Sequence, residues 1–281
     1  MRPALFAICP IVLLMLSACG GGDPETPVLQ PTPHLRVEAK IHNEEFALFL
    51  PDAQRPSSDA EILGAIDEYS QIVDPVAGFE GRDRYYGYGL NPVVYRAPPE
   101  APLGLFTRLL ELCGSQMVVK VRIELSVTSS GPPPVTIDLP RDESFIPSTR
   151  NWFTADTIRT EGRTWYEVGL APSGRGKVQG SDHPSSGLLG HQFDASLYQS
   201  LRSKVVTTLL DIEVPEDSYI DTFSVRYSRT DANESWVDTF LLLDAGDQVS
   251  AARMGSGEEP LGLYAVASDG LSNTPAAPAG D

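Results

Sequence analysis

Two stretches of the sequence gather side chains that could bind a ligand or catalyse a reaction. The first is GSDHPSSGLLGHQFD, residues 180–194, which holds two histidines and two aspartates. Imidazole nitrogens and carboxylate oxygens are common ligands of zinc and other divalent ions. One hypothesis is therefore a divalent metal site at Asp182, His183, His191 and Asp194. Their spacing matches no helical zinc motif, so an ordinary surface loop is the alternative.

The second stretch is GFEGRDRYYGYGLNPVVY, residues 78–95, which interleaves tyrosine, arginine and glycine. Tyr and Arg are enriched among the residues that dominate protein interfaces, and aromatic rings also stack on sugars. The alternative is that the tyrosines cover the core and leave their hydroxyls in water. If the chain has a binding surface, this pattern places it at Arg82, Arg84, Tyr85, Tyr86 and Tyr88.

Signals for catalysis are weaker. Asp211 and Glu213 would share one face of a strand and could act as a glycosidase pair, but apolar residues opposite them favour a solvated pair. The chain has no Gly-x-Ser-x-Gly, His-Glu-x-x-His or Ser-x-x-Lys motif. The sequence therefore favours a non-catalytic module that binds a protein or a cell-envelope glycan. A periplasmic or surface hydrolase, metal-assisted through His183 and His191, is the alternative.

The first 18 residues have the layout of a secretory signal peptide. A positive charge at Arg2 precedes an apolar run over residues 4–16, which is shorter than the roughly 20 residues that span a membrane. The run ends in Leu-Ser-Ala-Cys at residues 16–19, which resembles the lipobox of bacterial lipoproteins. The resemblance implies export, cleavage before Cys19 and acylation of its sulfur.

Residues 19–33 follow as a Gly- and Pro-rich segment with little apolar surface to bury. We expect a flexible tether that holds the folded region away from a membrane, with a reach of roughly 40 Å. Gly20 and Gly21 come directly after the cysteine. By similarity with lipoprotein sorting in enterobacteria, these glycines favour attachment to the outer membrane. The sequence is compatible with either the periplasmic or the surface face of that membrane.

Composition excludes some functions. The formal net charge of −17 disfavours nucleic-acid binding, which needs a basic surface. Of the three cysteines, Cys9 leaves with the signal peptide and Cys19 would carry lipid, so Cys113 has no disulfide partner in the mature chain. Cys113 lies on an apolar helical face and is expected to be a buried hydrophobe. No cofactor is expected beyond the lipid and the candidate metal.

Several elements must position these stretches. Periodicity and capping predict a β-hairpin over 35–50, a helix over 59–72 that begins with a Ser58–Glu61 capping box, and a second helix between Pro102 and Gly114. Alternating apolar residues predict a strand over 117–127. Further strands are expected over 132–140, 163–171, 205–214, 221–229 and 235–243, the last two forming a hairpin.

The predicted strands and helices do not alternate along the chain, so the predicted fold is a β-rich α+β domain. We expect an antiparallel sheet or β-sandwich with two or three helices. The globular region covers 34–270, with a candidate boundary near 129–134 and a long surface loop over 171–194. Residues 271–281 are expected to be a disordered tail, and no internal repeat is visible in the sequence.

Overall fold

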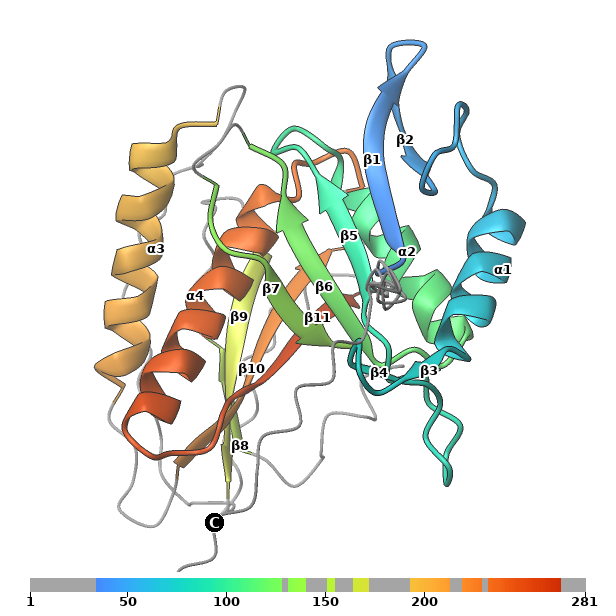
Figure 1. The fold of residues 1–281 in the computed structure, drawn as a ribbon. Coiled ribbons are helices and arrows are strands. Elements are labelled where there is room, and N and C mark those ends of the chain that lie inside the picture. The colour runs from blue at the N-terminus through green and yellow to red at the C-terminus, as the bar shows by residue number, and fades with distance from the viewer. Residues whose placement is uncertain are drawn as a thin grey trace, which may run out of the picture. The chain divides into compact units, whose positions relative to one another are not determined.

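The computed structural model describes residues 34–127, 131–139, 151–154, 164–171, 193–212, 219–228 and 232–268. Four helices and one large mixed sheet form within these ranges (Figure 1). The helices are α1 (Asp59–Ser70), α2 (Leu103–Ser115), α3 (Ala195–Leu210) and α4 (Val237–Gly255). None of these helices is long and apolar enough to cross a membrane. The predicted signal peptide, tether and C-terminal tail lie outside the described residues.

The large sheet has nine strands in the order β2-β1-β5-β6-β7-β11-β10-β9-β8. Its strands are β1 (Arg36–His42), β2 (Glu45–Phe49), β5 (Val93–Ala97), β6 (Lys120–Leu125), β7 (Val135–Asp138), β8 (Asn151–Thr154), β9 (Thr164–Ala171), β10 (Tyr219–Ser228) and β11 (Gly262–Ser268). A small second ribbon pairs β3 (Val73–Asp74) with β4 (Phe79–Glu80). The α+β class is confirmed, but no second large sheet that would make a β-sandwich lies among the described residues.

Local sequence signals account for the first elements. β1 and β2 pair antiparallel through a two-residue turn, in which Asn43 and Glu44 both have positive φ angles of 50° and 69°. Helix α1 begins at the predicted capping box, where the Glu61 N–H donates to Oγ of Ser58 at 3.4 Å and the Ser58 N–H donates to the Glu61 carboxylate at 2.8 Å. Both predictions are confirmed.

Parallel strands joined by helices were not expected, and here the prediction is wrong. β1 pairs parallel with β5, β5 with β6, and β10 with β11, and a helix lies in each connection. The unit β5-α2-β6 thus has the same strand–helix–strand topology as β10-α4-β11. The two units share this arrangement although the sequence shows no internal repeat.

The segments that precede α2 and α4 pair with each other as short antiparallel chains, with a bridge between Pro102 and Ser235. The first N–H groups of a helix have no intrahelical partner. At α2 the N-cap is Pro102, whose side chain makes no cap hydrogen bond. Instead the Leu103 N–H donates to the Glu234 carbonyl at 2.6 Å, and the Gly104 N–H donates to the Ala232 carbonyl at 2.8 Å. We call this pairing the helix-start seam.

Two predicted strands are helices in the structure. Residues 205–210 belong to α3, and residues 237–243 belong to α4. Every residue from Val237 to Gly246 is buried, so the start of α4 lacks the polar face that would mark a surface helix. A short apolar run of this kind fits a buried strand and a buried helix equally well by periodicity. The helix count is four in the described residues, not two or three.

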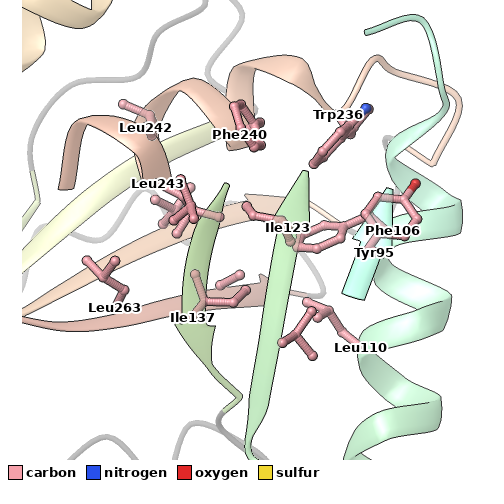
Figure 2. Packing of buried hydrophobic residues seen from close by; sticks show 14 of the residues in the cluster. Tyr95, Phe106, Leu110, Ile123, Ile137, Trp236, Phe240, Leu242, Leu243 and Leu263 are labelled. Atoms are coloured by element: carbon pink, nitrogen blue, oxygen red, sulfur yellow. The ribbon is translucent and has the colours of Figure 1, made fainter. Parts of the chain in front are cut away.

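Helix α4 lies across the second half of the sheet and supplies much of the core (Figure 1). Figure 2 shows Ile123 of β6 between side chains of α2 and α4, and Ile137 of β7 on the side of the sheet that α4 covers. At the helix-start seam, the rings of Trp236 and Tyr95 pack edge to face with 5.1 Å between their centroids. The Nε1–H of Trp236 donates to the Pro98 carbonyl at 2.7 Å. Trp236 is fully buried, so the seam is part of the core.

Gly246 allows α4 to pack closely against β10 and β11. A Cβ atom built there would lie 2.8 Å from Cε1 of Phe223 and 3.1 Å from Cδ2 of Leu263. Gly64 in α1 offers a matched control, because a Cβ atom there would meet nothing within 4 Å. The helix–sheet distance at α4 therefore depends on the missing side chain of Gly246.

We expect Gly246→Ala to lower the free energy of unfolding by about 1–3 kcal/mol, because the methyl group overpacks the interface. Gly64→Ala should raise it by about 0.5–1 kcal/mol through the better helix propensity of alanine. Urea denaturation of both variants measures the contrast. A stabilising effect at Gly246 would contradict the close packing of α4 on β10 and β11.

Candidate functional site

The predicted binding stretch forms a hairpin over residues 82–89, which projects beyond the sheet near β3 and β4 (Figure 1, teal loop). Arg82 and Gly89 form its antiparallel bridge, and Gly89 also pairs with Val118 after α2. The hairpin leads directly into β5, which begins at Val93. It is therefore joined at its base to the end of the sheet from which β5 starts.

A side-chain cap shapes the tip of this hairpin. Oδ1 of Asp83 accepts the N–H groups of Tyr85 at 2.9 Å and Tyr86 at 2.7 Å. The Gly87 N–H then donates to the Asp83 carbonyl at 3.0 Å, and Gly87 has a φ angle of 71°. Aspartate is favoured in such turns because its carboxylate accepts from the backbone two residues on. This role was not predicted, although the Asp-x-Tyr-Tyr-Gly pattern is a signal for it.

Arg82 holds the base of the hairpin. Its Nη1 donates to the carbonyls of Gly87 at 3.0 Å and Gln116 at 3.2 Å, and its Nη2 donates to Oδ1 of Asp67 at 2.9 Å. Gln116 caps the end of α2 and Asp67 belongs to α1. The guanidinium thus joins the hairpin to two helices through three hydrogen bonds, so Arg82 positions the surface.

The other predicted residues divide by exposure. Arg84 is exposed, and the side chains of Tyr85 and Tyr86 are 89% and 70% exposed. Tyr88 is partly buried, and its ring stacks on Tyr86 at 5.5 Å between centroids with planes 22° apart. Four of the eight exposed large hydrophobic residues in the described part of the chain lie within residues 73–86. The structure therefore gathers the predicted residues, with three of them at the tip.

The candidate metal site is largely outside the described residues, which exclude Asp182, His183 and His191. The fourth predicted ligand, Asp194, is the N-cap of α3, where Oδ1 accepts the Leu197 N–H at 2.9 Å. This cap is an ordinary use of aspartate at a helix start. Among the described residues, no three His, Cys, Asp or Glu side chains gather as metal ligands.

Two other candidates have structural roles. Asp211 is the C-cap of α3 and does not lie on a strand, while Glu213 falls outside the described residues. Cys113 is fully buried in α2, and this burial raises the pKa of its thiol, which keeps the sulfur protonated and unreactive. The expectation that Cys113 is a buried hydrophobe is confirmed.

The most buried charges join α3 to α4. Oδ2 of Asp244 accepts Nη1 of Arg202 at 2.9 Å and the Tyr198 hydroxyl at 2.8 Å. Asp244 is fully buried, and this desolvation raises the pKa of its carboxyl although both partners oppose the shift. Burial, followed by the charge of Asp244, also raises the pKa of Asp247 on the same helix. The cluster joins α3 to α4, and both helices lie far from the hairpin in the sequence.

Comparison with known proteins returns no relative. No family model matches the chain, and no curated protein or solved structure matches it. Function must therefore be argued from the hairpin, from the elements that hold it and from the N-terminal sequence.

We expect Arg82→Met to loosen the hairpin, because the variant loses three hydrogen bonds that join it to α1 and α2. The free energy of unfolding should fall by about 1–2 kcal/mol, and the N–H groups of Tyr85 and Tyr86 should exchange faster with solvent. The matched control is Arg84→Met, since Arg84 makes no hydrogen bond or ion pair with the described residues. Equal exchange in the two variants would show that Arg82 does not hold the hairpin.

Asp244 predicts a pH dependence of stability. An acid with a higher pKa in the folded state binds its proton more tightly there, so stability is lost as the pH rises from the ordinary value of 3.8 through the folded pKa. The wild type should therefore lose stability relative to Asp244→Asn as the pH rises above about 4. Urea denaturation across this range gives both curves. Parallel curves would show that Asp244 does not titrate differently on folding.

Proposed function

We propose that this protein is an exported lipoprotein, anchored to the outer membrane by acyl chains on Cys19, whose folded region is a non-catalytic binding or assembly module. The lipobox-like residues 16–19 and the apolar run before them support the anchor. The ligand is a protein or a cell-envelope glycan, and the acidic composition disfavours nucleic acid. The hairpin over residues 82–89 is the binding surface.

One observation carries the binding role: the side chains of Tyr85 and Tyr86 are 89% and 70% exposed, on a hairpin that Arg82 and Asp83 hold in place. Exposed aromatic side chains cost solvation free energy, and their clustering on a surface marks interaction sites. Because Asp83 and Arg82 already fix the backbone, little conformational entropy is lost on binding. Tyrosine and arginine are also the residue types that contribute most to interface affinity.

The ionisable groups next to the tip favour binding over proton transfer. The Asp83 carboxylate accepts two backbone N–H groups, and Arg82 donates to two carbonyls and Asp67. These hydrogen bonds occupy the groups that a catalytic site would need as an acid or a base. The exposed side chains at the tip are those of Arg84, Tyr85 and Tyr86.

A crosslinked pull-down from the native envelope tests the proposal, with full-length protein, Cys19→Ala and Tyr86→Ser compared. Cys19→Ala should abolish acyl labelling and release the protein from membranes. Tyr86→Ser should reduce recovery of the ligand at least about tenfold, as for a hot-spot residue, while membrane anchoring is unchanged. Leu197→Ser is the control, because Leu197 is a 40% exposed apolar residue on α3.

Continued acyl labelling of Cys19→Ala would overturn the anchor. Equal ligand recovery with Tyr86→Ser and with Leu197→Ser would overturn the hairpin as the binding surface. Circular dichroism of each variant confirms that the comparison is made on folded protein.

A further inference from the structure

The turn at the tip of the hairpin has a counterpart between β3 and β4. Oδ1 of Asp74 accepts the N–H groups of Val76 and Ala77, both at 3.1 Å, as Oδ1 of Asp83 accepts those of the residues two and three positions after it. In each turn a glycine with a positive φ angle follows at the fourth position, and the angle is 81° at Gly78. We call these loops the two Asp-capped turns; they are DPVAGF, residues 74–79, and DRYYGY, residues 83–88.

The two Asp-capped turns expose apolar side chains at equivalent positions. The residue two positions after the aspartate is Val76 in the first turn and Tyr85 in the second, and they are 93% and 89% exposed. Val73 and Tyr86 are also large apolar residues that are mostly exposed. Large apolar side chains that gather on a surface mark an interaction site. The first turn therefore extends the surface that the hairpin provides.

Both turns are held on one base. Asn91 is fully buried, its Oδ1 accepts the Gly81 N–H at 3.1 Å, and its Nδ2 donates to the Tyr69 carbonyl at 3.0 Å, at the end of α1. A Cβ atom built on Gly81 would lie 2.6 Å from Cγ2 of Val73, so the base of the first turn packs against the base of the second. Because Arg82 fixes the next residue to α1 and α2, the two tips are held in place before a ligand binds.

The side chains on the two turns favour a protein over a glycan. Sugar and other small-ligand sites are concave and combine apolar walls with several convergent polar groups. Here the exposed side chains stand at the tips of turns, and the aliphatic Val76 has neither a ring to stack on a sugar nor a group to hydrogen-bond it. The carboxylates of Asp74 and Asp83 accept from the backbone instead. An apolar centre with few free charges is typical of protein–protein interfaces.

The charges around the two turns indicate the chemistry of the partner. Residues 67–89 carry five carboxylates and two arginines, in a chain with a net charge of −17. A second copy of the chain would bring the same acidic surroundings, and this repulsion disfavours self-association through the surface. A partner with an apolar interface centre and a basic rim is complementary to it.

We infer that the two Asp-capped turns together bind one protein, different from this chain, which presents apolar pockets for Val76 and for Tyr85 with Tyr86 inside a basic rim. This inference rests on the proposed function. It names which of the two ligand classes the surface takes, and it adds the turn between β3 and β4 to the hairpin.

Photocrosslinking in intact cells tests the inference. The full-length protein carries p-benzoylphenylalanine in place of Val76, of Tyr86, or of Leu197 on α3 as the matched control. We expect protease-sensitive adducts with the same protein from positions 76 and 86, each at least about fivefold stronger than from position 197. Val76→Ser should weaken the adduct from position 86 at least about threefold, because both turns bind the same partner, whereas Leu197→Ser should leave it unchanged.

The salt dependence of the association tests the basic rim. Recovery of the partner with the wild-type protein from solubilised envelopes should fall at least about threefold between about 50 mM and about 500 mM NaCl, because salt screens the attraction between the two surfaces. Recovery that does not change with salt would overturn the basic rim.

The other outcomes separate this inference from the proposed function. An adduct removed by muramidase would identify a glycan, and an adduct between two copies of this chain would identify self-association. An adduct from position 86 alone, which Val76→Ser does not weaken, would show that the first turn takes no part. Each of these results overturns the inference and leaves the binding module intact. An adduct from position 86 no stronger than from position 197 would overturn the hairpin as a binding surface and with it the proposed function.

Discussion

The structure depends above all on the helix-start seam between the segments before α2 and α4. Helix α2 begins at a proline that cannot cap it, and backbone carbonyls of Glu234 and Ala232 receive its first N–H groups. Buried N–H groups without partners cost about 1–3 kcal/mol each, so in the folded protein the start of α2 relies on carbonyl groups from the second half of the chain. Gly104 permits this contact, since a Cβ there would lie 2.9 Å from the Ala232 carbonyl oxygen. The seam in turn sets Trp236 against Tyr95 in the core.

The elements that were predicted correctly carry their signals locally. The capping box at Ser58 fixes the start of α1, and alternating side chains identify β6, whose residues alternate between partly buried and buried. Helix α4 was misassigned because tertiary burial removes the polar positions that reveal a helical period. Helix α3 was misassigned at its C-terminal half, where Val206, Thr208 and Leu210 imitate the alternation of a strand. Parallel pairing and the repeated topology depend on contacts between distant residues, which one sequence does not display.

Residue types in the candidate site were predictable, but the division of their roles was not. Tyrosine and arginine between glycines indicate an exposed surface, and the structure places Tyr85 and Tyr86 there. Arg82 and Arg84 look equivalent in the sequence, yet only Arg82 has Asp67 and Gln116 within reach, because α1 and α2 happen to end beside it. Asp194 likewise belongs to a helix cap, since the residues after it fold as α3. The roles of Arg82 and Asp194 therefore depend on where the helix ends lie in the folded protein.

The helix-start seam also has a consequence for the order of folding. Trp236 and the Pro98 carbonyl that it contacts are 138 residues apart, so the loop between them must close before either helix start is satisfied. Contacts of such long range slow folding and leave apolar surface open in the meantime. A chain that is synthesised from its N-terminus presents Pro98 well before Trp236. The first half therefore needs protection from aggregation during this interval, and a truncation before residue 236 should produce a protein that chaperones retain and proteases remove.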